Sequence, residues 1–562
     1  MARKFVIVGG VAGGASAAAR LRRLDETADI VLFEQGPHIS YSSCALPYAL
    51  SGAVPDLSSL LLMTPERFRA QHRIDVRTRS EVTALLREKK AVRVREASGR
   101  VYEEPYDALI LSPGAAPIIP PVPGADGPNV FTLKDVEDAA AIRERAASHG
   151  ARAAAVIGGG FIGVEAAVNL AASLDVTLVE AADQILAPFD RDMAQILEKD
   201  LLDHGVRLVL GDGLAAVEDG EVRLASGRRV PADLIVMAIG VRPRTALARD
   251  AGLAIGESGA IAVDADGRTS DSSIYAVGDA AEVMLPLQGR RGRLALAFPA
   301  QKEARRAADA LCGAPHPNRG YLGSIGLELF TLRAAATGLN EKDIEARRIP
   351  HDFAYVIPFD RVSLMPGASP LHLKVHFEAP TGRLLGAQAV GQGAPDRRVD
   401  VIAALIAKGG TLEDLADVDL CYAPPFATAK DAVHLAALVG LNLLHGAFRQ
   451  IPVSAVRGLV EKGAYFLDVR ERPEYEAGHI RGAANIPLSE LRDRLEEIPK
   501  DRPLYVHCRS GQRSYYACRV LAAHGFSDVY NIAGSYLALS LYEYAEDRLT
   551  GRTPIVTAYN FN

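Results

Sequence analysis

The stretch Lys4-Phe-Val-Ile-Val-Gly-Gly-Val-Ala-Gly-Gly14 decides the fold. It starts with an apolar run of the kind that forms a buried parallel strand. The glycines that follow let the backbone approach a pyrophosphate, and an Ala-rich helix then offers its unpaired N–H groups. A second apolar run, Asp29–Phe33, precedes Glu34, whose carboxylate can accept hydrogen bonds from a ribose. This order predicts a Rossmann-like dinucleotide-binding unit, although Val11 stands at the middle glycine of G-x-G-x-x-G.

The same pattern recurs later in the chain. The apolar run 153–157 leads into Gly158-Gly-Gly-Phe-Ile-Gly163, which matches G-x-G-x-x-G in full. Glu180 ends the next apolar run, 22 residues after Gly158 (180 − 158). A carboxylate at this position binds both ribose hydroxyls and repels a 2′-phosphate, and the residues 181–184 contain no arginine. The second unit therefore favours NADH over NADPH.

Two dinucleotide units in one chain predict two dinucleotides, typically FAD and a nicotinamide. Two further apolar runs end at Gly114 and Gly240, where each could close the crevice of one unit. The run Ile274-Tyr-Ala-Val-Gly-Asp279 places a carboxylate where it could hold a ribityl chain. The predicted cofactor-binding residues are Gly9, Gly13, Gly14, Glu34, Gly114, Gly158, Gly160, Gly163, Glu180, Gly240, Gly278 and Asp279.

Composition and charge argue against several classes of protein. The 562 residues carry a net charge of −6, which favours neither a nucleic-acid nor a membrane partner. The apolar runs are too short for a membrane span, and the first residues lack a signal-peptide pattern, so we expect a cytoplasmic protein. The 5 cysteines are scattered and none forms a CxxC pair, so neither a disulfide framework nor a metal site is predicted.

Residues 1 to about 320 resemble the pyridine nucleotide–disulfide oxidoreductase family of flavoproteins. The two glycine turns and Tyr-Ala-Val-Gly-Asp occur in the same order. The resemblance implies that 1–115 and 245–320 bind FAD and that an NADH-binding domain, 116–244, is inserted between them.

Cys44 is the candidate redox thiol. It lies in Ile39-Ser-Tyr-Ser-Ser-Cys-Ala-Leu-Pro-Tyr48 without a second cysteine nearby, so spacing alone leaves a buried structural role equally open. The segment resembles the Ser-Tyr-x-x-Cys-Gly-Leu-Pro-Tyr signature of the coenzyme A–disulfide reductase branch, which includes NADH oxidases and persulfide reductases. The resemblance implies that Cys44 is catalytic and faces the flavin, with Ser40 and Ser43 as substrate contacts. Ala45 replaces the usual glycine and Ser43 the usual asparagine.

The same resemblance adds two basic residues and a tyrosine. Arg20 and Arg22 read as a solvated helix face, but in this branch basic residues there lie near the phosphates of coenzyme A, a third candidate ligand. Residues 321–446 match the family's dimerisation domain and imply a homodimer. Tyr422, more often a packing residue in such a position, is a candidate catalytic group reaching the partner's thiol. A second tyrosine expected before Pro-Gly-Ala is missing near Leu364, where the sequence reads Ser363-Leu-Met-Pro-Gly-Ala368.

Residues 452–545 resemble a rhodanese domain, with a tail at 546–562. A strand delivers Cys508 into the loop Cys508-Arg-Ser-Gly-Gln-Arg-Ser514, ahead of a helix. Backbone N–H groups at a helix start, together with Arg509 and Arg513, favour a thiolate and bind anions. A cysteine phosphatase loop needs five residues between cysteine and arginine, and this loop has four. Cys508 is therefore a candidate catalytic thiol, with both arginines as substrate contacts.

These features predict an α/β protein with two Rossmann-like domains, an α+β dimerisation domain and a C-terminal α/β rhodanese domain. We expect an FAD-dependent, NADH-linked reductase of persulfide, polysulfide or coenzyme A disulfide, which exchanges sulfur with Cys508. An NADH oxidase or peroxidase that cycles a cysteine sulfenic acid is the alternative. A sulfur carrier or sensor with little reductase turnover is the second alternative.

Overall fold

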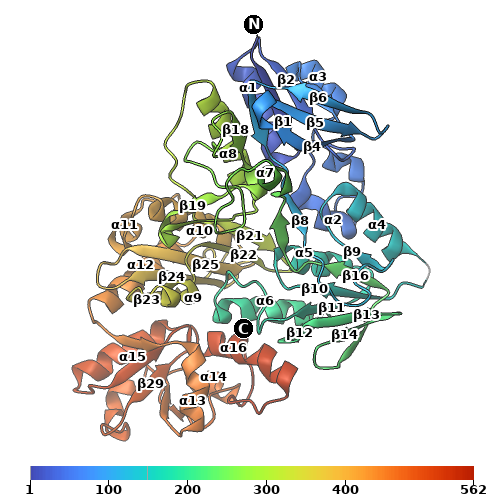
Figure 1. The fold of residues 1–562 in the computed structure, drawn as a ribbon. Helices are drawn as coiled ribbons and strands as arrows, with labels where there is room; N and C mark the ends of the chain where they lie inside the picture. Colours follow the sequence, from blue (N-terminus) through green and yellow to red (C-terminus); the bar gives the residue numbers. More distant parts are fainter. Residues whose placement is uncertain (1, 149, 562) are drawn as a thin grey trace. The chain divides into compact units, whose positions relative to one another are not determined.

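The computed structural model describes residues 2–148 and 150–561 and divides into two compact units. The first comprises Met1–Thr177 and Gly213–Gly323, and the second comprises Leu178–Asp212 and Ser324–Asn562. The predicted ranges 1–115 and 546–562 therefore begin or end on a residue outside the described chain. Figure 1 shows the elements of both units, which are treated separately below.

A parallel five-stranded sheet forms the core of the first unit, in the order β18-β7-β1-β2-β3. Its strands are Ile274–Ala276, Ala108–Leu111, Lys4–Val8, Asp29–Phe33 and Asp75–Arg77. Alternate residues of β1 and β2 pack into two separate apolar cores, which is why both strands read as continuous apolar runs. Helices α1 (Ala12–Leu24) and α8 (Ala297–Leu311) pack together and contribute small side chains to one core.

The first unit also holds the second glycine turn. Strands β10 (Ala153–Ile157), β16 (Leu234–Met237) and β9 (Val130–Phe131) are parallel, and α5 (Phe161–Leu170) follows the turn. Short antiparallel strands β8 (Ala115–Pro117) and β17 (Val241–Pro243) pair with each other. Further elements are α2 Leu46–Leu50, α3 Pro65–His72, α4 Val136–Ala147, α7 Ala246–Asp250, β4 Ser80–Leu86, β5 Ala91–Glu96, β6 Val101–Pro105, β13 Leu214–Glu218, β14 Glu221–Leu224, β15 Arg229–Pro231, β19 Val283–Leu285 and β20 Arg290–Gly292.

An antiparallel sheet, in the order β21-β22-β25-β24-β23, begins the second unit. Its strands are Ile325–Glu328, Arg333–Gly338, Leu384–Gly391, Leu371–Glu378 and His351–Val356, and its helices are α9 Glu341–Ala346, α10 Pro395–Ile406, α11 Leu412–Asp417 and α12 Ala432–Leu444. Helix α12 packs on β23 and β24. It begins at Ala432, after the Asp431 side chain that caps it.

Helix α6 (Arg191–Asp203) contacts this sheet through a buried ionic cluster. Lys374 Nζ lies 3.0 Å from Oδ2 of both Asp190 and Asp192, and His376 Nε2 lies 2.7 Å from Asp190 Oδ2. Burial raises the pKa of Asp190, but the charges of Lys374 and His376 outweigh burial and hold it well below its usual range. Lys374 lies within the otherwise largely apolar strand β24, and its burial depends on the packing of the segment 190–192 against this strand.

A second parallel sheet, in the order β26-β30-β29-β27-β28, forms the C-terminal part of the second unit. Its strands are Arg449–Ile451, Val529–Ile532, Leu504–His507, Tyr465–Asp468 and Ala484–Asn485. Figure 1 shows α13 (Val456–Glu461), α14 (Arg472–Glu476), α15 (Gln512–Ala523) and α16 (Ser535–Thr550) around β29. The predicted fold class is confirmed in each of these parts. Along the described residues, no helix is both long and apolar enough to cross a membrane.

Candidate functional site

The first glycine turn brings three backbone segments into close approach. Gly9 has φ +98°, and a Cβ added there would lie 2.0 Å from the Ser112 carbonyl oxygen. A Cβ on Gly14 would lie 1.8 Å from the Gly9 carbonyl oxygen. Glu34 Oε2 accepts a hydrogen bond of 2.7 Å from the Gly10 N–H, so its carboxylate is fixed beside the turn. The arrangement fits a dinucleotide whose pyrophosphate meets the start of α1 and whose ribose meets Glu34.

Packing within the protein requires glycine at only some positions of the second glycine turn. Gly158 has φ +109°, and a Cβ added there would lie 2.5 Å from the Ala238 carbonyl oxygen. A Cβ added to Gly163 would lie 1.9 Å from the Gly158 carbonyl oxygen. Gly160, in contrast, has φ −76°, and an added Cβ would meet no atom within 4 Å. Neither backbone conformation nor packing requires glycine at 160. The open space beside its backbone fits the close approach of a pyrophosphate.

Three further predicted residues, Gly114, Gly240 and Glu180, lie at the ends of strands. Gly114 (φ +67°) and Gly240 (φ +113°) each immediately precede one strand of the β8–β17 pair. Glu180 closes β11 (Asp175–Glu180) and lies in the second unit, where its Oε1 accepts a hydrogen bond of 2.8 Å from the Ala182 N–H.

Asp279 lies in a short 3-10 turn directly after β18. Burial raises its pKa, and Lys134 Nζ lies 3.7 Å from its Oδ2. The preceding N–H, of Gly278, donates to Glu303 Oε2 at 2.7 Å. Sequence reasoning missed Lys134 and Glu303, because their partners lie far away along the chain.

Cys44 is exposed on a one-turn 3-10 helix that runs into α2. Helix α2 packs against α5, and the Tyr48 hydroxyl donates to Glu165 Oε1 at 3.1 Å. Burial raises the pKa of Glu165, although the Tyr48 hydrogen bond opposes the shift. The segment that carries Cys44 is therefore attached to the helix that follows the second glycine turn. No spacing rule could have paired Tyr48 with Glu165.

Ser40 and Ser43 are placed by backbone hydrogen bonds. Ser40 has φ +47°, and its N–H donates to the Gly10 carbonyl oxygen at 2.9 Å. The Ser43 N–H donates to the Tyr41 carbonyl oxygen at 3.1 Å. These contacts hold the loop before Cys44 against the first glycine turn.

Arg20 and Arg22 are anchored within the first unit. Arg20 Nε donates to Asp309 Oδ1 at 2.6 Å. Arg22 is buried, and its guanidinium donates to four backbone carbonyls, those of Asp25, Glu26, His72 and Arg73. The expected solvated helix face is therefore wrong for Arg22. Its N–H groups bind carbonyls at the end of α1 and in the segment after α3. This arrangement does not favour the binding of a coenzyme A phosphate by Arg22, which the resemblance implies.

Tyr422 lies in the loop between α11 and α12 and is 51% exposed. Phe426 in the same loop and Leu364 in the loop after β23 are 66% and 90% exposed. A hydrogen bond of 3.2 Å from the Val362 N–H to the Pro424 carbonyl oxygen joins the two loops. They form an exposed apolar face on the part of the chain predicted to dimerise.

Cys508 lies at the bottom of a loop between β29 and α15 and is 1% exposed. The Gly511 N–H donates to its Sγ at 3.2 Å, and the Ser514 hydroxyl lies 3.5 Å from the same sulfur. The Cys508 N–H donates to Ser535 Oγ at 3.1 Å. Two donors thus lie within reach of the sulfur at the start of α15. Neither Ser514 nor Ser535 was predicted as a site residue.

The two arginines of this loop differ in their contacts. Arg513 donates two hydrogen bonds, of 2.6 and 2.7 Å, to the Glu474 carboxylate, which fixes its planar group. Burial and the neighbouring charge of Arg513 lower the pKa of Arg509. Both cations lie at the loop, as the sequence predicts, and Arg513 is paired with Glu474.

Comparison with known sequences decides the family. The profile of the pyridine nucleotide-disulphide oxidoreductases matches residues 3–304, and the profile of the family's dimerisation domain matches residues 328–433. This chain belongs to that family. A rhodanese-like domain matches residues 453–541 of this oxidoreductase. Family membership implies FAD and a pyridine nucleotide, and the two glycine turns described above fit them.

Relatives of the oxidoreductase include two groups of activities. A coenzyme A disulfide reductase of Staphylococcus epidermidis and an NADH oxidase of Methanocaldococcus jannaschii are each 32% identical to it, over 77% and 78% of this chain and 98% and 99% of their own. The structure of reduced Bacillus anthracis CoADR-RHD is 40% identical, with a TM-score of 0.94 over 96% of this chain and 98% of its own. An NAD-dependent persulfide reductase of A. fulgidus is 34% identical, with a TM-score of 0.91 over 95% and 99%.

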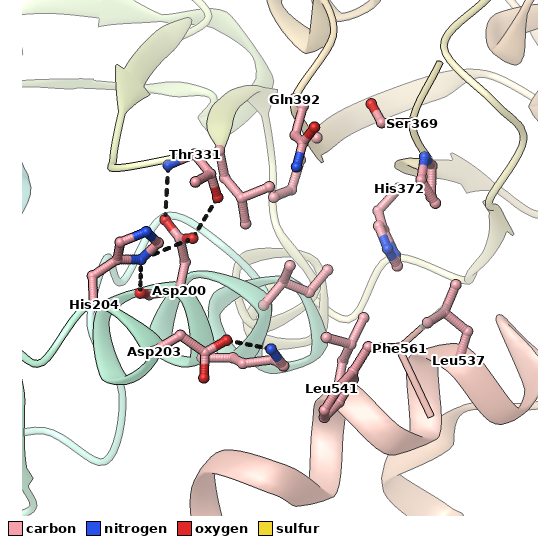
Figure 2. Close-up of a pocket in the computed structure, with 16 residues that line it drawn as sticks. Asp200, Asp203, His204, Thr331, Ser369, His372, Gln392, Leu537, Leu541 and Phe561 are labelled. Carbon is pink, nitrogen blue, oxygen red and sulfur yellow. Dashed lines mark hydrogen bonds and ion pairs between the residues drawn. The ribbon is translucent and has the colours of Figure 1, made fainter. Parts of the chain in front are cut away.

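The oxidoreductase has a further cavity, of about 260 Å³, in its second unit (Figure 2). Asp200, Asp203 and His204 line it from the C-terminal part of α6, and Leu537 and Leu541 line it from α16. No predicted site residue lines it. The cavity shows that α6 contacts the rhodanese-like part as well as the antiparallel sheet, a contact that the sequence did not reveal.

Proposed function

We propose that this oxidoreductase is an NADH-dependent reductase of persulfide, polysulfide or coenzyme A disulfide, with Cys44 as its redox thiol. One observation carries the proposal: an exposed thiol, Cys44, lies on a segment whose Ser40 N–H donates to the first glycine turn, and it shares a chain with a second thiol, Cys508, whose sulfur accepts a hydrogen bond from the Gly511 N–H. The persulfide and coenzyme A disulfide reductases that it resembles along nearly their whole lengths support this assignment. The carboxylate of Glu180 supports NADH as the nucleotide.

The chemistry is thiol–disulfide exchange at Cys44. FAD, when bound, supplies the transfer of two electrons from NADH to sulfur. The Cys44 thiolate attacks the R-bearing sulfur of R–S–SH, forms a mixed disulfide with R and releases HS⁻. Two electrons and one proton then break the mixed disulfide and return the Cys44 thiolate and RSH. The sum is NADH + H⁺ + RSSH → NAD⁺ + RSH + H₂S, and a disulfide RSSR gives two RSH in the same way.

Cys508 exchanges sulfane sulfur in this proposal. Its thiolate takes the terminal sulfur atom of polysulfide or thiosulfate and releases a polysulfide one sulfur shorter or sulfite. The persulfide on Cys508 then passes that sulfur to a thiol acceptor such as coenzyme A, which becomes a persulfide and restores the Cys508 thiolate. Arg509 and Arg513 supply the positive charge that an anionic sulfur donor needs. The oxidoreductase acts as a homodimer in which Tyr422 reaches the partner's redox thiol and donates a proton. The exposed apolar face around Tyr422 supports this arrangement.

The test is anaerobic NADH consumption by the FAD-loaded protein with polysulfide, coenzyme A persulfide or coenzyme A disulfide. We expect turnover with sulfide or thiol release, which Cys44→Ser abolishes and Cys421→Ser, at another exposed cysteine, leaves intact. Cys508→Ser should remove only the activities that need sulfur loading. Its matched control is Cys518→Ser, at a buried cysteine on α15.

An NADH oxidase is the second candidate, because a relative with that activity matches as closely as the reductases do. In that case Cys44 cycles through a sulfenic acid and oxygen is the acceptor. Fast turnover in air without a sulfur compound, and little with any of the three sulfur substrates, would replace the reductase proposal with this one. Slow turnover with every acceptor would indicate a sulfur carrier instead.

A further inference from the structure

A buried carboxyl group lies directly beneath the turn that carries Asp279. Glu303, on α8, is 9% exposed, and its Oε2 accepts the 2.7 Å hydrogen bond from the Gly278 N–H. Its Oε1 is buried and has no hydrogen-bond partner among the described residues. An ionised carboxylate with one oxygen unpaired and buried is costly, whereas the neutral acid avoids that cost.

The charged groups around Glu303 do not neutralise it. Asp279 faces it from the turn, Lys302 and Arg306 come from α8, and the phenol of Tyr321 lies nearby. Lys302 Nζ lies over the Tyr321 ring at 4.7 Å, and the Arg306 guanidinium donates to Asn318 Oδ1 and to the Pro317 carbonyl oxygen. Burial, with the added charge of Asp279, raises the pKa of Glu303 to about 8.

The Gly278 turn lies beside the first glycine turn. A Cβ on Gly278 would lie 3.7 Å from Ser112 Oγ, and a Cβ on Gly13 would lie 2.5 Å from the same oxygen. We propose that Glu303 is a positioning residue for FAD that works as a neutral carboxylic acid. It accepts the Gly278 N–H and so holds Asp279 in place, without adding a second negative charge beside Asp279 and the diphosphate.

The proposal predicts the direction of a pH dependence. Ionisation of Glu303 places two carboxylates side by side next to an anionic ligand, so the affinity for FAD falls as the pH rises through about 8. The diphosphate raises the pKa of Glu303 further in the holoenzyme, so the binding of FAD to the ionised apoprotein takes up a proton from the solvent. The affinity therefore falls by at most about tenfold per pH unit above that pKa.

The experiment compares FAD release from diluted holoenzymes between about pH 7 and about pH 10, followed by the fluorescence of free FAD. Glu303→Gln keeps the acceptor oxygen and cannot ionise, so we expect it to hold FAD at pH 7 as the wild type does and to lose the alkaline release. Glu257→Gln removes an exposed carboxylate of the same unit and is the control, with the wild-type profile expected. Glu303→Ala, which lacks the acceptor, should release more FAD at every pH.

Parallel pH profiles for wild type and Glu303→Gln would overturn the proposal, whether or not the sulfur chemistry is correct. A second measurement needs no variant of Glu303. Infrared difference spectra of wild-type holoenzyme across the same pH range should show the loss of a protonated carboxylic acid. Absence of that signal also overturns the proposal. Because neither readout uses a sulfur substrate, failure here leaves the proposed reductase function in place.

Discussion

Gly160→Ala tests whether the second glycine turn binds a pyrophosphate. Alanine adopts the observed φ of −76° freely, and its Cβ would meet no protein atom within 4 Å. The fold and the FAD content should therefore stay unchanged. The methyl group would instead occupy the space into which a pyrophosphate must come to reach the N–H groups at the start of α5.

The size of the effect follows from the hydrogen bonds at risk. A hydrogen bond from a backbone N–H to a charged oxygen contributes about 1.5–3 kcal/mol. Loss of one such bond raises the KM for NADH by roughly ten- to a hundredfold, at about 1.4 kcal/mol per tenfold. Steady-state kinetics with saturating acceptor measures this value, and calorimetry measures the Tm of the same preparation.

Two other glycine-to-alanine variants serve as controls. Gly163→Ala should lower the Tm, because its Cβ would lie 1.9 Å from the Gly158 carbonyl oxygen and the backbone must shift. Gly458→Ala lies inside α13, where an added Cβ again meets nothing, and it should be neutral or slightly stabilising. If Gly160→Ala leaves the KM for NADH within about twofold of wild type, the interpretation of the glycine turn is refuted.

The remaining predictions concern the second unit. Lys374→Met removes the buried cation between Asp190 and Asp192 and should cost about 3–5 kcal/mol, seen in calorimetry as a lower Tm than that of the exposed control Lys408→Met. The difference should shrink in acid, because a carboxylate with a depressed pKa stabilises the fold above its unfolded pKa of about 3.9 and loses that contribution as the pH falls. Arg513→Lys keeps the charge but not the two parallel hydrogen bonds, so sulfur transfer should fall by roughly tenfold. NADH-dependent reduction of coenzyme A disulfide should be unaffected, and an equal loss of both activities would contradict the separate roles.

Local patterns carried most of the prediction. The fold class, the family and the rhodanese-like domain followed from short segments, and each is confirmed. A strand, a glycine turn and a helix are contiguous, so Gly14 and Gly9 meet because of their spacing and not because of distant packing. The Cys508 loop is local in the same way, since the Gly511 N–H that reaches its sulfur lies three residues away.

Only the tertiary structure decided what the long-range partners do. The sequence left Arg22 as either a ligand contact or a solvated residue. In the structure its guanidinium donates hydrogen bonds to backbone carbonyls about 50 residues away. Tyr48 and Glu165 meet across 117 residues, and Lys374 and Asp192 across 182. Neither a period nor a motif fixes such pairs, because they depend on which faces pack together once the strands are placed. The sequence by itself determined the two glycine turns and the loops that carry the thiols, and packing determined which charges beside them are buried or paired.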